Sequence, residues 1–190
     1  MNYINMDSIN FTANHIKNVN IAKRYYNNYK PCKVALVEME STNPGDIKAI
    51  EKTANKWDIS FTVFTHQDML EAQKNEELLP KLKVYALTKQ KNNFEKMNYS
   101  DILGVIEVVK KDDPGTKIEI LQTKPSFIND KHNKKPAFTH IGKNLVNYVK
   151  KEYNKEPLYV NPTKVAVPFY EKLGFRPSDK RNTWCITPKS

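Results

Sequence analysis

The stretch that decides the fold is "LQTKPSFINDKHNKKPAFTHIGKNLVNYV", residues 121–149. It starts at the end of an alternating, strand-like run and passes through a loop rich in lysine. It then enters a segment, 137–153, in which apolar side chains recur at helical spacing. The pattern predicts a strand, a basic loop and a helix with Gly142 near its start.

The start of this helix is a candidate anion-binding site. The first four N–H groups of a helix have no partner inside it, and the helix dipole adds positive charge there. Glycine lets a phosphate approach these groups closely, and Lys134, Lys135 and Lys143 lie nearby in the sequence. We therefore expect a pyrophosphate seat. The alternative is that Gly142 only lets the helix pack close to a strand.

Outward from this stretch, hydrophobic patterning and turn residues divide the chain into elements. "DDPG", residues 112–115, is a turn signal that joins two strand-like runs into a hairpin. Asn43 can cap a helix that has Pro44 in its first position. Strands are expected at 33–40, 83–89, 101–111, 117–123, 158–160 and 182–187.

Two further helices are expected beside those that start at Pro44 and within 137–153. One begins near Thr65 and runs towards Leu79, after a short extended piece at 58–65. The other begins at Pro168, because proline is tolerated in the first turn but not in mid-helix, and ends before Gly174. The predicted order is strand, two helices, three strands, helix, strand, helix, strand.

Length and composition favour one globular domain over residues 31–190, preceded by an Asn-rich N-terminal arm or extension, 1–30. The net charge of +10 suits a polyanionic partner, although solvated surface lysines would give the same number. The four histidines are scattered, so we predict no metal site. The N-terminus does not resemble a signal peptide, and no apolar run would span a membrane; we expect a cytoplasmic protein.

Three segments together resemble the GCN5-related N-acetyltransferase (GNAT) superfamily. The run from Leu121 to Pro125, followed by a loop and "HIGKNL", is similar to the family's central strand and helix signature. "VAVPFYEKLGFRP", residues 165–177, looks like its C-terminal motif, and "ILGVIEVV", residues 102–109, like its third strand. The resemblance is clear over 83–190 and consistent over 31–82, and it indicates no subfamily.

The sequence departs from the family's signature at two positions. Ala137 stands where the family has Gln or Arg, and His140 stands where it has its first Gly. The resemblance nevertheless implies a GNAT-like α+β (mixed α/β) fold. In that fold a central, twisted, mostly antiparallel sheet of about six to seven strands has helices on both faces and is splayed at the cofactor cleft.

The resemblance implies that acetyl-CoA is the co-substrate and that the acetyl group passes directly to an amine. Tyr170 matches the family's proton donor to the leaving thiolate; without that match, it would read as a packing aromatic. Glu119, expected on the face of Leu121, is the predicted general base, with Glu107 and His140 as alternatives. The residues expected to bind the cofactor are Leu121, Gln122, Thr123, Lys134, Lys135, Thr139, His140, Ile141, Gly142, Lys143, Asn144, Phe169 and Tyr170.

The expected partner is an amine-bearing acceptor, either a small molecule or the amine of a protein or aminoacyl-tRNA. The basic charge leaves nucleic acid open as a partner, the 1–30 arm leaves open a homodimer, and no membrane association is expected. A function from another class also remains. The departures at Ala137 and His140 would suit a catalytically degenerate GNAT-fold protein that binds nucleic acid or a protein through its basic surface.

Overall fold

The protein is described here by a computed structural model covering residues 13–57, 60–112, 115–127, 135–179 and 182–188. Its described strands form a single sheet in the order β6-β1-β2-β3-β4-β5-β7-β9-β8. The strands are β1 (Asn14–Tyr25), β2 (Asn28–Met39), β3 (Leu82–Thr88), β4 (Ile102–Lys110), β5 (Thr116–Thr123), β6 (Phe138–Thr139), β7 (Leu158–Val160), β8 (Arg176–Pro177) and β9 (Trp184–Ile186). The helices are α1 (Pro44–Trp57), α2 (Ser60–Lys74), α3 (Ile141–Glu152) and α4 (Val167–Lys172), with short 3-10 turns η1 (Phe94–Lys96), η2 (Tyr99–Asp101) and η3 (Pro125–Phe127).

The predicted fold class is confirmed, but the predicted count of six to seven strands is wrong. The described residues form nine strands, and every pairing is antiparallel except that of β5 with β7. The unexpected strands are β1, β6 and β8. β6 and β8 have two residues each, too few to show a period, and β1 is polar over much of its length because it lies near the edge of the sheet.

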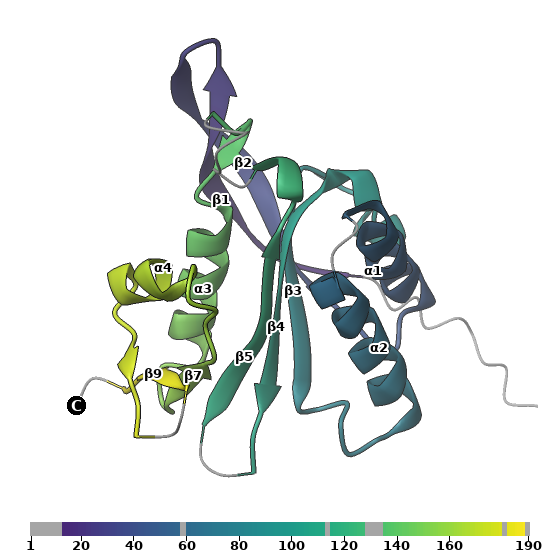
Figure 1. Cartoon of the computed structure of the whole chain (residues 1–190). Helices are drawn as coiled ribbons and strands as arrows, with labels where there is room; N and C mark the ends of the chain where they lie inside the picture. The colour runs from purple at the N-terminus through teal and green to yellow at the C-terminus, as the bar shows by residue number, and fades with distance from the viewer. Residues whose placement is uncertain (1–12, 58–59, 113–114, 128–134, 180–181, 189–190) are drawn as a thin grey trace, which may run out of the picture.

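The N-terminal part of the described chain belongs to this sheet. β1 pairs with β2 from Asn14 to Tyr25, and the predicted boundary after residue 30 lies inside β2. Residues 14–39 are therefore one long hairpin, which projects beyond the rest of the sheet in Figure 1. The remainder of the predicted arm, residues 1–12, lies outside the described residues.

Helices cover both faces of the sheet, as expected. α1 and α2 lie on one face, and α3 and α4 lie on the other (Figure 1). Each face has its own buried cluster: Val37, Ile50 and Met69 belong to the first, and Leu36, Leu145 and Phe175 to the second. None of the described helices has the length and apolar character needed to cross a membrane.

Three of the four described helices begin close to the predicted position, among them α3, which begins at Ile141 beside Gly142. α1 begins at Pro44, and Asn43 accepts a hydrogen bond from the Gly45 N–H at 2.8 Å. α4 begins at Val167, one residue before the predicted start at Pro168. The extended piece predicted at 58–65 is wrong for its described part, because α2 already begins at Ser60. Met69 and Ala72 of α2 are buried in the cluster on this face of the sheet, and this tertiary contact outweighs the weak helix preference of the Thr and Phe residues in α2.

A glycine on β4 sets how closely α3 approaches the sheet. A Cβ built on Gly104 would lie 2.5 Å from Cγ2 of Ile141, far inside van der Waals contact. The close packing of helix on strand, one of the two roles considered for Gly142, therefore depends on Gly104. Because Gly104 has no side chain, the first turn of α3 can lie close against the sheet at β4 and β5.

Candidate active site

A cavity of about 740 Å³ opens where β5 loses its neighbour. β5 is paired with β4 from Thr116 to Thr123, but with β7 only from Thr116 to Ile118. Within the part of the chain that the structure describes, no strand pairs with the other edge of β5 beyond Ile118. The two strands diverge there, and the cavity lies between β5, the start of α3, the segment 160–166 and α4.

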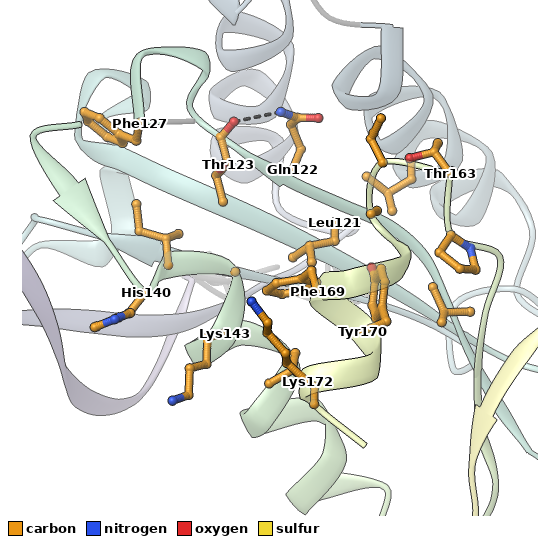
Figure 2. A pocket seen from close by; sticks show the side chains of 18 of the residues that line it. Leu121, Gln122, Thr123, Phe127, His140, Lys143, Thr163, Phe169, Tyr170 and Lys172 are labelled. Carbon is orange, nitrogen blue, oxygen red and sulfur yellow. Dashed lines mark hydrogen bonds between the residues drawn. The ribbon is translucent and has the colours of Figure 1, made fainter. Parts of the chain in front are cut away.

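The start of α3 forms one wall of this cavity. His140 precedes the helix with a left-handed φ of 67° and makes no side-chain cap, so the first amides of α3 are left to face a ligand. A Cβ built on Gly142 would lie 3.4 Å from Phe169 Cζ and 3.7 Å from Leu121 Cδ2, two residues of the cavity wall. Glycine thus keeps this part of the cavity open. Figure 2 shows Lys143 and Lys172 beside it, and both line the cavity.

Most of the predicted cofactor residues line the cavity: Leu121, Gln122, Thr123, Thr139, His140, Ile141, Gly142, Lys143, Phe169 and Tyr170. Two others lie elsewhere. The amide of Asn144 donates to the backbone oxygen of His140 at 2.8 Å, and the side chain of Lys135 is exposed outside the lining set. Lys134 lies outside the described residues.

Sequence reasoning missed a second group of lining residues. They come from β5, from η3, from β6 and the residue Pro136 before it, from the end of β7 and the segment that follows it, and from the C-terminal end of α4: Ile120, Phe127, Pro136, Phe138, Val160, Asn161, Pro162, Thr163, Val165, Ala166, Lys172 and Leu173. Those that lie between regular elements have no helix or strand period in the sequence, so only the folded chain brings them together. One available signal was Thr163, which starts the turn before α4: its backbone oxygen accepts from the Ala166 N–H at 2.9 Å.

Tyr170 lies in the first turn of α4 and is 5% exposed. Its ring makes edge contacts with Phe169 and Phe175, at centroid distances of 5.0 and 5.4 Å. Figure 2 shows its hydroxyl directed away from α4, towards the strand that carries Leu121. Burial raises the pKa of the phenol above its ordinary value, so Tyr170 stays protonated and can donate a hydrogen bond into the cavity.

Glu119 lies in the cavity wall but is held in ion pairs. Its two oxygens lie 2.7 Å from Lys111 Nζ and 2.6 Å from Lys117 Nζ. Burial alone would raise the pKa of Glu119, but the hydrogen bonds and charges of the two lysines outweigh it and lower the pKa. The carboxylate is therefore a weak base.

The expectation that Glu119 and Leu121 share a face of β5 is wrong. The β4–β5 register shifts opposite Glu107, so that Ile120 faces Glu107 and Ile118 faces the next residue of β4. Ile118 and Leu121, three apart, consequently both pack in the cluster beneath α3. Glu119 follows Ile118 and points to the opposite face. A bulge of this kind breaks the alternation on which the expectation rested.

Glu107, the alternative base, is completely buried. Burial and the nearby carboxylate of Asp68 raise its pKa to about 8. Such a pKa would suit a base near neutral pH, but Glu107 is not among the residues that line the cavity. Among the described lining residues, the acid is Glu119. The residue with the better pKa and the residue with access to the cavity are thus different.

The comparisons with known proteins agree with this architecture. A model of the acetyltransferase (GNAT) domain matches residues 63–183. A solved GNAT-family protein from Desulfovibrio desulfuricans is 11% identical, with a TM-score of 0.54, and the match covers 80% of this chain and 99% of that one.

Two further structures are similar over shorter spans. The toxin AtaT, bound to the C-terminus of the antitoxin AtaR and to acetyl-CoA, is 16% identical over 67% of this chain and 78% of that one, with a TM-score of 0.47. The Bacillus subtilis N-acetyltransferase YlbP with coenzyme A is 16% identical over 66% and 82%, with a TM-score of 0.40. No curated protein sequence matches the chain. On the match of the family model to well over half of its length, the chain belongs to the GNAT family of acetyltransferases.

Proposed function

We propose that this GNAT acetyltransferase moves an acetyl group from acetyl-CoA directly to an amine, with Tyr170 as proton donor to the leaving thiolate. The observation that carries the proposal is the open edge of β5 beyond Ile118, which forms one side of a cavity lined by Tyr170. Such an edge offers backbone N–H and C=O groups to an extended ligand.

The free edge of β5 fits the pantetheine arm of acetyl-CoA. The arm carries two amide groups, which would pair with backbone groups between Leu121 and Thr123 as a short added strand would. The backbone oxygen of Thr123 already accepts from the Gln122 amide at 2.7 Å, drawn as a dashed line in Figure 2, and a carbonyl oxygen can accept once more. Gln122 thereby holds this end of the strand in place.

The first turn of α3 fits the pyrophosphate. His140, Ile141, Gly142 and Lys143 supply backbone amides at the positive end of the helix dipole. Lys143 and Lys172 add positive side-chain charge at the cavity wall. These lysines would serve in place of the Gln or Arg that the family has at the position of Ala137, and glycine at 142 keeps the approach clear.

Tyr170 would stabilise the departing thiolate. In water a phenol is a weaker acid than a thiol by about 1.5 pKa units, or 2 kcal/mol, and burial raises the pKa of Tyr170 further. The same apolar walls would also raise the pKa of a thiol between them, so the two effects partly cancel. We therefore assign Tyr170 a strong hydrogen bond to the developing negative charge.

Glu119 is proposed as the acceptor of the amine proton because it is the acid on the described cavity wall. Its lowered pKa makes it an inefficient base for an ammonium of pKa about 10.4. The amine substrate would then react mainly through the fraction that is already neutral in solution. On this proposal kcat/KM rises with pH towards the pKa of the amine and shows no step near the ordinary pKa of Glu.

A thermal shift with acetyl-CoA tests the binding step. A ligand at 100 times its dissociation constant adds about 2.7 kcal/mol to stability, which is a readily measured shift. Coenzyme A should give a comparable shift, and acetate should give none. Release of free thiol across a panel of small amines and aminoacyl-tRNAs then tests transfer. No shift at millimolar acetyl-CoA would rule out the proposed function.

A further inference from the structure

The end of the β1–β2 hairpin stands apart from the rest of the sheet. β2 pairs with β3 only from Ala35 onwards, and β1 pairs with β6 only at Ala22 and Lys23. Beyond these residues, the described part of the hairpin is a two-stranded ribbon, which projects past the neighbouring elements in Figure 1. A ribbon this exposed contributes little to the hydrophobic core. Its basic and aromatic side chains are therefore not explained by core packing.

Positive charge is concentrated in this ribbon. Residues 22–33, which run from the β6 contact through the tip towards the start of the β3 pairing, contain four Lys or Arg residues and no Asp or Glu, in a chain whose net charge is +10. None of the four forms an ion pair with a described residue. Lys23 and Lys30 lie directly opposite each other, an arrangement of like charges that destabilises a hairpin. A bound anion would relieve this repulsion.

Three tyrosines surround these lysines at the tip. Tyr25, Tyr26 and Tyr29 are 44%, 99% and 40% exposed. The ammonium groups of Lys23 and Lys30 lie 5.2 and 5.9 Å from the ring centroid of Tyr25, on the same face of the ribbon. Tyr26 has a left-handed φ of 53°, which Asn or Gly would adopt at lower cost. Folding therefore does not account for an exposed aromatic residue there.

The ribbon is held in a fixed orientation beside the cavity. Arg24 donates through its guanidinium to the backbone oxygen of Lys135 and through its N–H to that of Ala137, the latter at 2.8 Å. The hydroxyl of Tyr29 donates to the backbone oxygen of Pro136 at 2.8 Å, and Pro136 lines the cavity. Anything bound at the tip would lie near the cavity wall.

We propose that the tip of this hairpin binds a single-stranded segment of nucleic acid. Lys23 and Lys30 contact its phosphates, and Tyr25 and Tyr26 stack on its unpaired bases. Basic side chains interleaved with exposed aromatic rings are the combination that single strands require, since every base has a face on which to stack. In a duplex the bases are already stacked on one another, so only the phosphates would be available for contact and the rings would have no base to stack on. The proposal does not depend on acetyl transfer.

Fluorescence anisotropy with a labelled 12-nucleotide RNA of mixed sequence measures the binding. The single strand should bind more tightly than the same sequence as a duplex. Its affinity should fall linearly with the logarithm of salt concentration, with a slope of about −0.7 per phosphate contacted. A DNA strand of the same sequence shows whether the sugar matters; equal binding of RNA and DNA supports stacking and phosphate contact alone.

Two variants divide the proposal into its parts. Tyr26→Asn removes the exposed ring while keeping a residue suited to left-handed φ, and it should weaken binding about five- to 100-fold. The double variant Lys23→Gln with Lys30→Gln should reduce the salt slope by about 1.4. Controls remote from the tip are Phe64→Ala, which removes an aromatic ring that is half-exposed, and the exposed pair Lys110→Gln with Lys151→Gln. Neither control should change the affinity by more than about twofold.

Three outcomes would overturn the proposal. Equal losses in the hairpin and control lysine variants would mean that the whole basic surface binds. Tighter binding of the duplex would exclude stacking, and competition by polyglutamate as strong as by RNA would indicate an acidic protein partner. All variants should acetylate a small amine at the wild-type rate, so a folding defect or a failed acetyltransferase assignment would be recognised separately.

Discussion

On one edge, β5 is paired with β4 from Thr116 to Thr123; on the other, its pairing with β7 stops at Ile118. The paired edge carries close packing and buried groups, among them Gly104 and Glu107. The open edge borders the cavity and the residues proposed to act on substrate. Changes on the open edge should therefore alter binding or turnover, and changes on the paired edge should alter stability. Four variants test this division.

The largest effect is expected on the open side, from Tyr170→Phe. The change removes one hydroxyl from a ring that keeps its contacts with Phe169 and Phe175. Loss of the hydrogen bond from Tyr170 to the developing thiolate should lower the rate of thiol release by a factor of about 100, the low end of what a positioned proton donor contributes. The thermal shift with acetyl-CoA and the melting temperature should change little. An unchanged rate of thiol release in Tyr170→Phe would show that Tyr170 is not the proton donor.

On the paired side, Glu107→Gln should change stability and its pH dependence. In the unfolded chain this carboxyl loses its proton near pH 4.5, but in the folded protein only near pH 8. Between these values the folded state binds more protons, so the free energy of unfolding falls as pH rises. Gln removes this loss and should stabilise the protein at pH 8 by an amount on the order of 3 kcal/mol.

Denaturant unfolding of wild type and Glu107→Gln at pH 5 and pH 8 measures this effect. Asp46, whose pKa burial raises to about 7, contributes a slope of the same sign in both proteins and cancels in the difference. The difference between the proteins should be small at pH 5 and large at pH 8. A loss of acetyl transfer in Glu107→Gln without a change in stability would instead place Glu107 in the active site. The division between a catalytic open edge and a structural paired edge of β5 would then be wrong.

A smaller loss is expected from Gly104→Ala, also on the paired side. The new Cβ would lie 2.5 Å from Ile141 Cγ2, so α3 must shift. Overpacking of this kind costs about 1 to 3 kcal/mol, measured by denaturant unfolding. Wild-type stability would show that α3 can move freely against the sheet.

The smallest effect is expected from the matched change Gly142→Ala on the open side. Its Cβ meets only ordinary contacts, the nearest at 3.4 Å, and alanine favours helix, so stability should stay level or rise slightly. The methyl group would narrow the pyrophosphate seat, and the affinity for acetyl-CoA should fall about tenfold, or 1.4 kcal/mol. Calorimetric titration checks this. Equal affinity of wild type and Gly142→Ala for acetyl-CoA would show that the phosphates do not bind at the first turn of α3.

Much of the fold could be predicted because local chemistry agrees with tertiary structure there. Pro44 and Pro168 mark the first turns of their helices, and the apolar run before "DDPG" and the alternating run after it form antiparallel β4 and β5. β1 and β6 could not be predicted in this way. The partner of β6 is β1, far away in sequence, and the polar residues of β1 carry no buried period although its main partner, β2, follows it directly.

The candidate site was predictable where a motif carried it. The residues from Leu121 to Thr123, the turn around Gly142 and the Phe169–Tyr170 pair were found from the resemblance and line one cavity. The proton acceptor was not predictable. A register shift in β5 reverses the face of Glu119, and two lysines brought in by folding lower its pKa.

The sequence by itself determined the starts of α1, α3 and α4, the paired strands of the central sheet and the residues of the acetyl-CoA signature, because these depend on neighbours within a few positions. Only the tertiary structure decided where the sheet opens, which carboxylate reaches the cavity and that the Asn-rich N-terminal segment becomes a projecting basic ribbon. These features depend on where pairing ends and on which distant side chains meet, and burial and charge take effect only once those contacts form.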